Sequence, residues 1–312
     1  MDVRPKKALG QHFLTDQSIA RAIVDSLSAT PRILEVGPGM GVLTQYLLQR
    51  TAPAGLAVAA SGGDSDALPA GQTSPAGKVP PCRASLVTPT PVSQATLKVV
   101  EIDEESVVYL REHYPALAPG LLQADFLKLP LDKIFAEPFS VIGNFPYNIS
   151  SQIFFHILDY RELVPEVVCM IQKEVAERLA AGPGSKTYGI LSVLLQMWYD
   201  IEYRFTVGEG AFVPPPKVKS AVIRLTRNAR VEAGCDEALL RRIVKATFGL
   251  RRKTLRNSLR SISIAGDDLP FLDERPELLS VEDFIALTRA VSVSRAGDAS
   301  RAGTTPPKGG AR

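Results

Sequence analysis

The sequence of 312 residues is poor in the residues that build disulfides and metal centres. It holds only three cysteines and three histidines, which stand far apart: Cys82, Cys169 and Cys235, and His12, His113 and His156. A disulfide-stabilised protein carries many closely spaced cysteines, and a zinc site groups its Cys and His ligands at short spacing. We therefore expect neither a disulfide framework nor a bound metal.

Long apolar runs and a large excess of one charge are also missing. No stretch approaches the roughly 18 apolar residues that a membrane span needs, and the first residues, MDVRPKK, show no signal-peptide pattern. These absences predict a soluble, cytoplasmic protein with no membrane partner. The net charge of +3 is too small to indicate a polyanionic partner, so the local distribution of charge has to decide that question.

An apolar run at residues 33–36 leads into a glycine-rich turn, GPGMG at 37–41, and then into helical spacing. Gly37 and Gly39 let the backbone pass close to a ligand at the N-terminus of the following helix. Glu35 precedes the turn, and the spacing G-x-G-x-G differs from the G-x-G-x-x-G of dinucleotide folds. The pattern resembles motif I of methyltransferases that use S-adenosylmethionine (SAM). A nicotinamide dinucleotide site and a purely structural turn are the alternatives.

Acidic residues end the next two predicted strands, at Glu101 and at Asp125. In nucleotide-binding folds, the carboxylate that accepts the ribose hydroxyls lies about 20 residues after the glycine turn. Residues 51–96 intervene here; they are rich in Ala, Gly, Ser, Thr and Pro and lack aromatic residues, which predicts a disordered insertion. Removing the insertion restores the usual spacing and favours Glu101 as the ribose carboxylate. The alternative is that Glu101 is only a solvated strand end.

A fourth apolar strand, at 139–144, ends in the sequence Asn-Phe-Pro-Tyr. Asn144 offers a neutral acceptor, Pro146 stiffens the turn, and Tyr147 offers a flat face, which together suit an aromatic amine. The stretch resembles the Asn/Asp-x-Pro-Tyr signature of SAM-dependent methyltransferases that act on exocyclic amino groups of nucleic-acid bases. The alternative is a strand-to-helix turn in which Asn144 caps the helix over 149–158 and Tyr147 packs inward.

Strands and helices alternate through this part of the chain, which predicts a doubly wound parallel sheet. Ligands of such sheets bind beyond the carboxyl ends of the strands. After residue 228 the pattern becomes helical, and residues 251–260 place five cations beside apolar positions. This density favours contacts with RNA phosphates over a merely solvated helix face. The candidate residues are Arg251, Arg252, Lys253 and Arg256.

Eight motifs in order resemble the KsgA family of small-subunit ribosomal RNA adenine N6,N6-dimethyltransferases: GQHFL, EVGPGMG, VEIDE, QADF, GNFPYNIS, QKEVAERLAAGPGSKTYG, FVPPPKVKSAV and FGLRRKTLRNSL. The resemblance implies a Rossmann-like SAM-dependent methyltransferase sheet with a small helical C-terminal domain. It also implies dimethylation of two adjacent adenosines in the 3′-terminal hairpin loop of small-subunit (16S) RNA. The partner is then the small-subunit RNA in a pre-subunit particle, and we expect a monomer.

The resemblance fixes an expected domain organisation. A basic N-terminal arm covers 1–16, the SAM-binding domain covers 17–227 with the insertion at 51–96, a helical RNA-binding domain covers 228–291, and a disordered tail covers 292–312.

The resemblance also implies roles for individual residues. The expected SAM contacts are His12, Leu14, Gly37, Gly39, Glu101, Ile102, Asp125, which faces the cofactor adenine, and Asn144. The expected catalytic residues are Asn144, Phe145, Pro146 and Tyr147. The target base stacks on Tyr147, and its amine hydrogens meet the Asn144 side-chain oxygen and the Phe145 carbonyl. Because the sulfonium methyl is a strong electrophile, positioning is the main task and no general base is needed.

Other functions share parts of this pattern. A large-subunit RNA methyltransferase and a DNA adenine methyltransferase share the first domain, and a non-enzymatic RNA-binding assembly or transcription factor could keep the fold without turnover. The motif FVPPPKVKSAV and the basic segment favour the small-subunit enzyme. The intact acids Glu101 and Asp125, together with Asn144, argue against a protein that has lost turnover.

Overall fold

The computed structural model describes residues 3, 5–6, 9–51 and 96–302, with side chains to residue 294. Apart from its two end residues, the insertion predicted at 51–96 lies outside the described residues, and so does 303–312. No helix in the described part of the chain is both long and apolar enough to cross a membrane.

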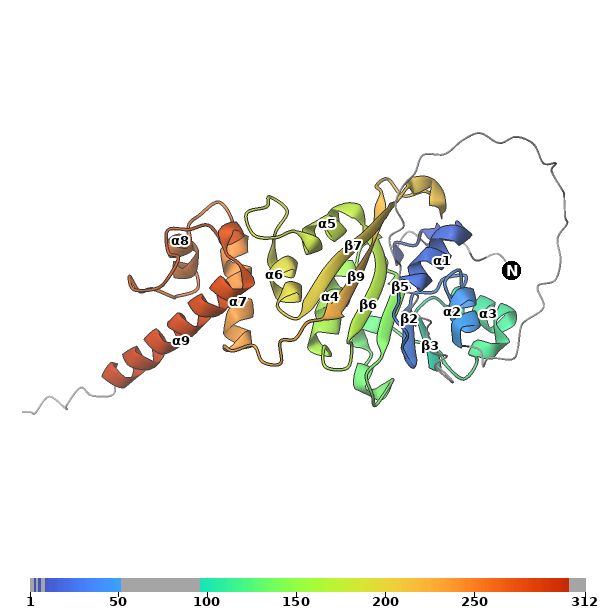
Figure 1. Ribbon diagram of the computed structural model, residues 1–312, viewed down its shortest axis with the longest axis horizontal. Helices are drawn as coiled ribbons and strands as arrows, with labels where there is room; N and C mark the ends of the chain where they lie inside the picture. The colour runs from blue at the N-terminus through green and yellow to red at the C-terminus, as the bar shows by residue number, and fades with distance from the viewer. Residues whose placement is uncertain (1–2, 4, 7–8, 52–95, 303–312) are drawn as a thin grey trace, which may run out of the picture.

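A seven-stranded sheet forms the centre of the molecule, in the order β4-β3-β2-β5-β6-β9-β7 (Figure 1). The strands are β2 Arg32–Val36, β3 Thr96–Glu101, β4 Leu121–Gln123, β5 Ser140–Asn144, β6 Glu166–Gln172, β7 Tyr199–Val207 and β9 Ser220–Arg227. The first five pair in parallel, and β9 runs antiparallel between β6 and β7. This arrangement confirms the predicted fold class.

Helices cover both faces of the sheet because successive strand residues point to opposite sides. Ile33, Ile142 and Val168 pack with α1 and α2 on one face, while Leu34 and Val141 belong to the larger core that includes α4 and α6 on the other. The helices before residue 200 are α1 Gln17–Asp25, α2 Thr44–Thr51, α3 Glu104–His113, α4 Ser150–Asp159, α5 Lys173–Ala180 and α6 Ile190–Gln196. Asp16 caps α1 by accepting hydrogen bonds from two backbone N–H groups.

The N-terminal arm is tied to the molecule by a second, two-stranded sheet. In it β1 Phe13–Leu14 pairs antiparallel with β8 Phe212–Val213. Both phenylalanine rings and Leu14 are buried. The pairing brings the arm beside the proline-rich connection that follows β8.

Three helices, α7 Glu237–Gly249, α8 Leu255–Arg260 and α9 Val281–Ala302, form one end of the molecule (Figure 1). The prediction of a continuous basic helix over 251–260 is wrong. Residues 251–253 form a turn between α7 and α8, closed by a hydrogen bond from Lys253 N to Leu250 O, because α7 ends at Gly249.

The last helix also differs from the prediction. Sequence analysis began a disordered tail at residue 292, whereas α9 continues to Ala302. The stretch from 292 to 302 contains one glycine and no proline, so it has no strong helix breaker. The division into two domains at residue 228 stays a prediction, since one hydrophobic cluster includes both Val167 in the sheet and Phe284 in α9.

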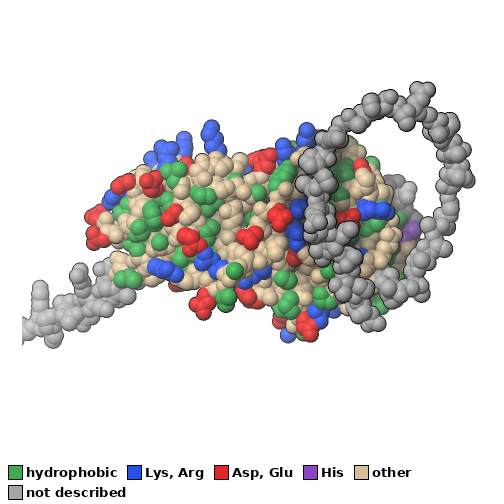
Figure 2. Space-filling view, in the orientation of Figure 1, with side chains coloured by type: hydrophobic (Ala, Val, Ile, Leu, Met, Phe, Trp, Pro, Cys, Tyr) green, Lys and Arg blue, Asp and Glu red, His purple; other side chains and the backbone are tan. Residues whose placement is uncertain are grey.

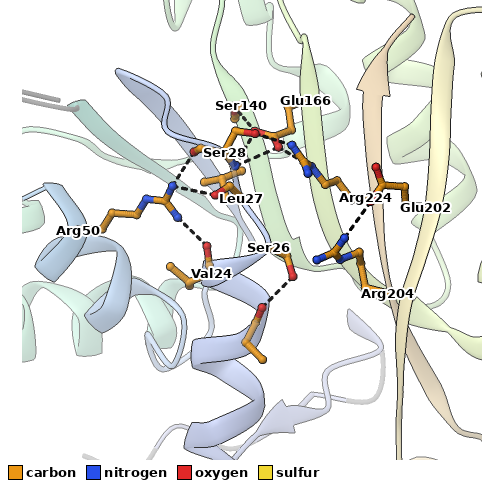
Figure 3. A network of polar contacts seen from close by, with 11 residues as sticks. Val24, Ser26, Leu27, Ser28, Arg50, Ser140, Glu166, Glu202, Arg204 and Arg224 are labelled. Atoms are coloured by element: carbon orange, nitrogen blue, oxygen red, sulfur yellow. Dashed lines mark hydrogen bonds and ion pairs between the residues drawn. The ribbon is translucent and has the colours of Figure 1, made fainter. Parts of the chain in front are cut away.

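A polar network joins α1, α2 and the sheet at the amino ends of the strands (Figure 3). Glu166, the first residue of β6, is 5% exposed and accepts hydrogen bonds from Ser28 N at 3.0 Å, Arg224 Nε at 2.8 Å and Ser140 Oγ at 3.2 Å. Arg50 donates to the carbonyl of Val24 in the last turn of α1 and to the carbonyls of Leu27 and Ser28, just after this helix. The network satisfies a helix end whose carbonyls have no partner within the helix.

Replacing Glu166 by alanine should destabilise the protein by about 2–3 kcal/mol, because it leaves the half-buried Arg224 and the Ser28 amide without their acceptor. Urea unfolding measures the loss as a lower midpoint. The matched control is Arg204→Ala, which breaks the exposed Arg204–Glu202 pair on the neighbouring strand and should cost less than about 1 kcal/mol (Figure 3). Equal midpoints for the two variants would show that the network does not stabilise the fold.

Candidate active site

A cavity of about 310 Å³ opens at the carboxyl ends of β2, β3, β4 and β5. Its wall is built from five segments of the chain: 9–14, 35–43, 100–102, 124–127 and 144–149. Every residue predicted to contact the cofactor or the target base lies in this wall. The strand ends meet here because parallel strands finish on the same edge of a sheet.

The glycine turn after β2 forms the floor of the cavity. Gly37 and Gly39 have φ of +67° and +56°, a left-handed conformation that favours glycine. A Cβ atom at Gly39 would also lie 2.9 Å from the ring of Phe13. The turn therefore needs glycine both for its conformation and for the close approach of the arm.

Glu101 is held rigidly beside this turn. It is 4% exposed and accepts hydrogen bonds from the backbone N–H groups of Gly39 at 3.2 Å, Ile102 at 2.8 Å and Asp103 at 2.9 Å. Burial raises the pKa of Glu101, and the three N–H groups oppose this rise by stabilising the carboxylate. The alternative that Glu101 is a solvated strand end is wrong. Ile102, in contrast, is 51% exposed at the mouth of the same pocket.

Glu35 is a site residue to which the sequence analysis gave no role of its own. It is fully buried at the end of β2, and one oxygen accepts from the Thr44 hydroxyl at 2.7 Å. The other oxygen, Oε1, has no partner within the described residues. Burial, and secondarily the negative charge of Glu101, raise the pKa of Glu35 to about 8, although the Thr44 hydroxyl opposes the rise. The sequence did hold a signal for Glu35, because an acidic residue inside an otherwise apolar strand is unusual.

Asn144 ends β5 and points its amide toward the arm. Its Nδ2 donates to the His12 carbonyl at 3.0 Å, while its Oδ1 accepts no hydrogen bond from the described residues. The alternative that Asn144 caps α4 is wrong, because the capping position is Ile149. The arm thus holds the donor side of the amide and leaves the acceptor side for a ligand.

Tyr147 stands next to Asn144 with its ring half-buried rather than packed fully inward. Its hydroxyl hydrogen-bonds the hydroxyl of Ser220, a buried residue at the start of β9. Its ring stacks with that of His12, with centroids 5.4 Å apart and planes at 28°. The His12 ring is fixed in turn, because its Nδ1 donates to the Pro214 carbonyl at 2.9 Å. The plane of the tyrosine ring is therefore set from both sides.

Asp125 lies two residues beyond the end of β4, in a turn rather than in the longer strand that the sequence predicts. Its Oδ1 accepts from Leu127 N at 3.0 Å, and its Oδ2 is 3.3 Å from the Lys128 ammonium. The turn fixes the carboxylate at the cavity wall, close to Phe126 and Leu127.

The N-terminal arm crosses the mouth of the cavity. Lys6 pairs with Asp103 and, at 3.1 Å, with Glu105, on the turn that begins α3. These two carboxylates raise the pKa of Lys6 through hydrogen bonds. The arm between Leu9 and His12 lines the cavity, and the ion pairs of Lys6 hold this arm beside it.

The predicted RNA-binding cations lie outside the cavity, and they differ among themselves. Arg256 contacts Asp267 at 2.8 Å and Asp273 at 3.3 Å, so its charge is already neutralised. Arg251 donates to the Ser185 carbonyl and lies 3.8 Å from Glu277. Arg252 and Lys253 are exposed and form no ion pair within the described residues.

The cavity fits SAM by the chemistry of its donors and acceptors. Glu101 offers carboxylate oxygens to ribose hydroxyls, and the unpartnered Glu35 Oε1 offers a buried acceptor for an ammonium group. Among the described residues, no group of three His, Cys, Asp or Glu side chains is placed to hold a metal ion.

Comparison with known proteins gives consistent matches. The model of the family "Ribosomal RNA adenine dimethylase" matches residues 3–54 and 93–277. "Ribosomal RNA small subunit methyltransferase A" of Phocaeicola vulgatus is 52% identical over 295 residues, covering 93% of this chain and 90% of that protein. The protein of the same name from Porphyromonas gingivalis is 51% identical, covering 92% of this chain and 98% of its own.

Two solved structures share the fold. A dimethyladenosine transferase from Plasmodium falciparum superposes with a TM-score of 0.65 at 19% identity, covering 91% of this chain and 98% of the other. The 23S rRNA methyltransferase ErmE superposes with a TM-score of 0.56 at 21% identity, covering 89% of this chain and 99% of the other.

Proposed function

Because the chain belongs to the family of ribosomal RNA adenine dimethylases, it is a SAM-dependent methyltransferase, and we propose that its acceptors are two adjacent adenosines of small-subunit RNA. Each would receive two methyl groups on N6, in the 3′-terminal hairpin loop of 16S RNA, during assembly of the small subunit. The observation that carries the proposal is the single cavity that joins the glycine turn and Glu101 to Asn144 and Tyr147.

The choice of the small subunit rests on sequence similarity. Relatives that are at least 50% identical over more than nine-tenths of the chain are named small-subunit methyltransferases. The large-subunit enzyme is only 21% identical, which supports a common fold and nothing finer. A pre-subunit particle is then the partner, the cytoplasm is the expected location, and we keep the expectation of a monomer.

In this proposal, the cofactor half of the site is built by Gly37, Gly39, Glu101 and Asp125, with Glu35 behind them. Glu101 would accept the ribose hydroxyls, Asp125 would face the adenine, and the exposed Ile102 would offer an apolar surface to the cofactor. Glu35 Oε1 would gain an ammonium partner, which no described residue provides. The bound cofactor supplies an electrophilic methyl group on a sulfonium sulfur.

The base half of the site is built by residues 144–147. Tyr147 stacks on the flipped adenine, an interaction worth about 1–3 kcal/mol per base. Asn144 Oδ1 and the Phe145 carbonyl accept the two amine hydrogens, which turns the N6 lone pair toward the methyl group. Pro146 keeps the turn rigid. N6 needs no base beforehand, because it becomes acidic once it carries the new bond and loses its proton to water.

The domain roles follow as part of the same proposal. Residues 17–227 bind SAM and the target base, the arm at 1–16 closes over both, and residues 228–291 contact the RNA. The alternative of an assembly factor without turnover is disfavoured because Glu101 and Asn144, the proposed ligands of the cofactor and of the target amine, line one cavity.

The deciding experiment incubates the purified protein and SAM with small-subunit particles that lack the modification. Mass spectrometry of RNA fragments should show N6,N6-dimethyladenosine at two neighbouring positions near the 3′ end. Particles without SAM are the negative control, and large subunits are the specificity control. Modification of large-subunit RNA alone, or of neither RNA, would overturn the proposal.

Replacing residues 52–95 by a short Gly/Ser link should leave SAM affinity and methylation within about twofold of the parent protein. The flanks of this segment are Thr51, which ends α2, and Thr96, which begins β3 opposite Arg32. Thr96 therefore lies at the amino ends of the strands, away from the cavity, and the family model leaves out residues 55–92. Long connections at such places cost little loop entropy.

Calorimetry and methylation of isolated particles test this deletion. Loss of methylation with SAM binding intact would mean that the segment reaches the ribosomal particle. Loss of SAM binding would mean that it supports the fold.

A further inference from the structure

Several cations on the edge of the molecule that carries the active site are left without an acidic partner. Five are exposed and form no ion pair within the described residues: Lys186, Lys217, Lys219, Arg252 and Lys253. We call this set the cationic edge. Nearby cations behave differently, since Arg178 pairs with Glu174 and Lys173 with Glu177 inside α5.

The first part of the cationic edge adjoins the base site. Lys219 immediately precedes Ser220, whose hydroxyl holds Tyr147, and its carbonyl accepts from Lys173 N at 2.9 Å. Lys217 lies two residues earlier, after the proline-rich segment that holds the His12 ring through Pro214. Both lysines are thus carried on a loop anchored to the residues that orient the target base.

The second part is joined across the molecule by two contacts. Gly184 N donates to the Glu277 carbonyl at 2.6 Å, and Arg251 Nη2 donates to the Ser185 carbonyl at 3.1 Å. The first bond docks the loop at 182–189, which carries Lys186, against the short helix at 276–278, and the second joins this loop to the turn that carries Arg252 and Lys253. Figure 2 shows Lys and Arg side chains projecting along one margin of the molecule, over the end with α7 and α8 and again farther along.

We propose that the cationic edge is the path of the RNA backbone that leads to the flipped adenosine, with Lys217 and Lys219 nearest the base and Arg252 and Lys253 farthest from it. The proposal rests on the proposed function and adds the route of the substrate. An RNA strand that enters the site carries a phosphate every few ångströms along its backbone. Ammonium and guanidinium groups without an acidic partner bind these phosphates and displace their counterions. Arg251 then acts as a positioning residue within the second part, since it ties the loop that carries Lys186 to the turn that carries Arg252 and Lys253. The helix α5 connects the two parts, because it begins at Lys173, whose N–H bonds the Lys219 carbonyl, and ends at Ala180, just before that loop.

The test is the variant Lys186→Gln/Lys217→Gln/Lys219→Gln, which removes charges that the basic segment at 251–260 does not include. Its affinity for unmodified small-subunit particles is measured over a range of salt. For single-stranded contacts, the slope of log affinity against log salt should flatten by about 0.7 for each lost phosphate, or about two units in all. SAM affinity should stay unchanged.

The matched control is Arg21→Gln/Arg111→Gln, two exposed cations outside the cationic edge and outside the basic segment at 251–260, which form no ion pair within the described residues. It should leave the salt slope unaltered. The proposed route would be overturned if the triple variant kept the salt slope of the parent protein. It would also be overturned if the control flattened the slope by the same amount per removed charge. If the parent protein fails to methylate these particles at all, the proposed function itself is wrong, so the two failures are distinct. Lys186→Gln alone, in a loop distant from Tyr147, repeats the test should the triple variant fold poorly.

Discussion

Asn144→Ala should lower the rate of methyl transfer by about a hundredfold or more while leaving SAM affinity close to that of the parent protein. Asn144 Oδ1 is the acceptor that no described residue occupies, and the amide is oriented by the His12 carbonyl at 3.0 Å. Removing it allows the target amine to rotate, and a misplacement of about 1 Å at a reacting centre can cost about a hundredfold in rate.

Single-turnover methylation of small-subunit particles measures this effect without interference from product release. The matched control is Asn148→Ala, which removes an exposed amide from the same turn, at the same cavity, and should change the rate by less than about threefold. Near-parental transfer by Asn144→Ala would remove Asn144 from the reaction. A large loss of SAM affinity would instead place it with the cofactor.

Glu101→Ala should weaken SAM binding by about 1.5–3 kcal/mol, or roughly 10- to 150-fold in Kd, because a charged acceptor for two hydroxyls is lost. Glu101 also accepts three backbone hydrogen bonds, so the variant leaves the Gly39, Ile102 and Asp103 N–H groups without their partner. The glycine turn loses its support at the same time as the ribose loses its acceptor.

Calorimetry of the folded variant, with circular dichroism to establish folding, gives the SAM affinity. Glu104→Ala is the matched control, since it removes an exposed carboxylate three residues away that forms no ion pair within the described residues. Its affinity should stay within about twofold of the parent. Unchanged SAM affinity in folded Glu101→Ala would exclude Glu101 from the cofactor site. The Asn144→Ala variant differs, because there the expected loss is in the rate of methyl transfer and not in SAM affinity.

The sheet and its ligand edge could be predicted because they follow from local patterns. Buried parallel strands appear as short apolar runs, as at 33–36 and 167–171, and the residues after them must meet on one edge. The glycines at 37 and 39 indicate the turn in the sequence, and the structure places both in the left-handed conformation. The candidate ligands that line the cavity can therefore be named from the sequence, with Glu35 as the exception.

The pairings that tune the site could not be predicted, because each joins residues far apart in the chain. Asn144 meets the His12 carbonyl, and Tyr147 meets Ser220, through contacts that no local spacing encodes. Arg256, which stays a predicted phosphate ligand, pairs with Asp267 and Asp273 after α8, and no helical spacing indicates these contacts. Charge counts along a helix do not show which charges the tertiary fold has already paired.

The N-terminal arm beside the cavity also affects whether the enzyme keeps its hold on one adenosine between the two methyl transfers. One segment lines the cofactor pocket, is fastened by Lys6 to Asp103, and holds Asn144 through His12. An opening of this arm to exchange the cofactor would also break the hydrogen bond that orients Asn144, the proposed acceptor of the target amine. Because each adenosine receives two methyl groups, we expect the enzyme to loosen its hold on the base between them. Monomethyladenosine should then accumulate early in a time course and decline later, as in a distributive reaction.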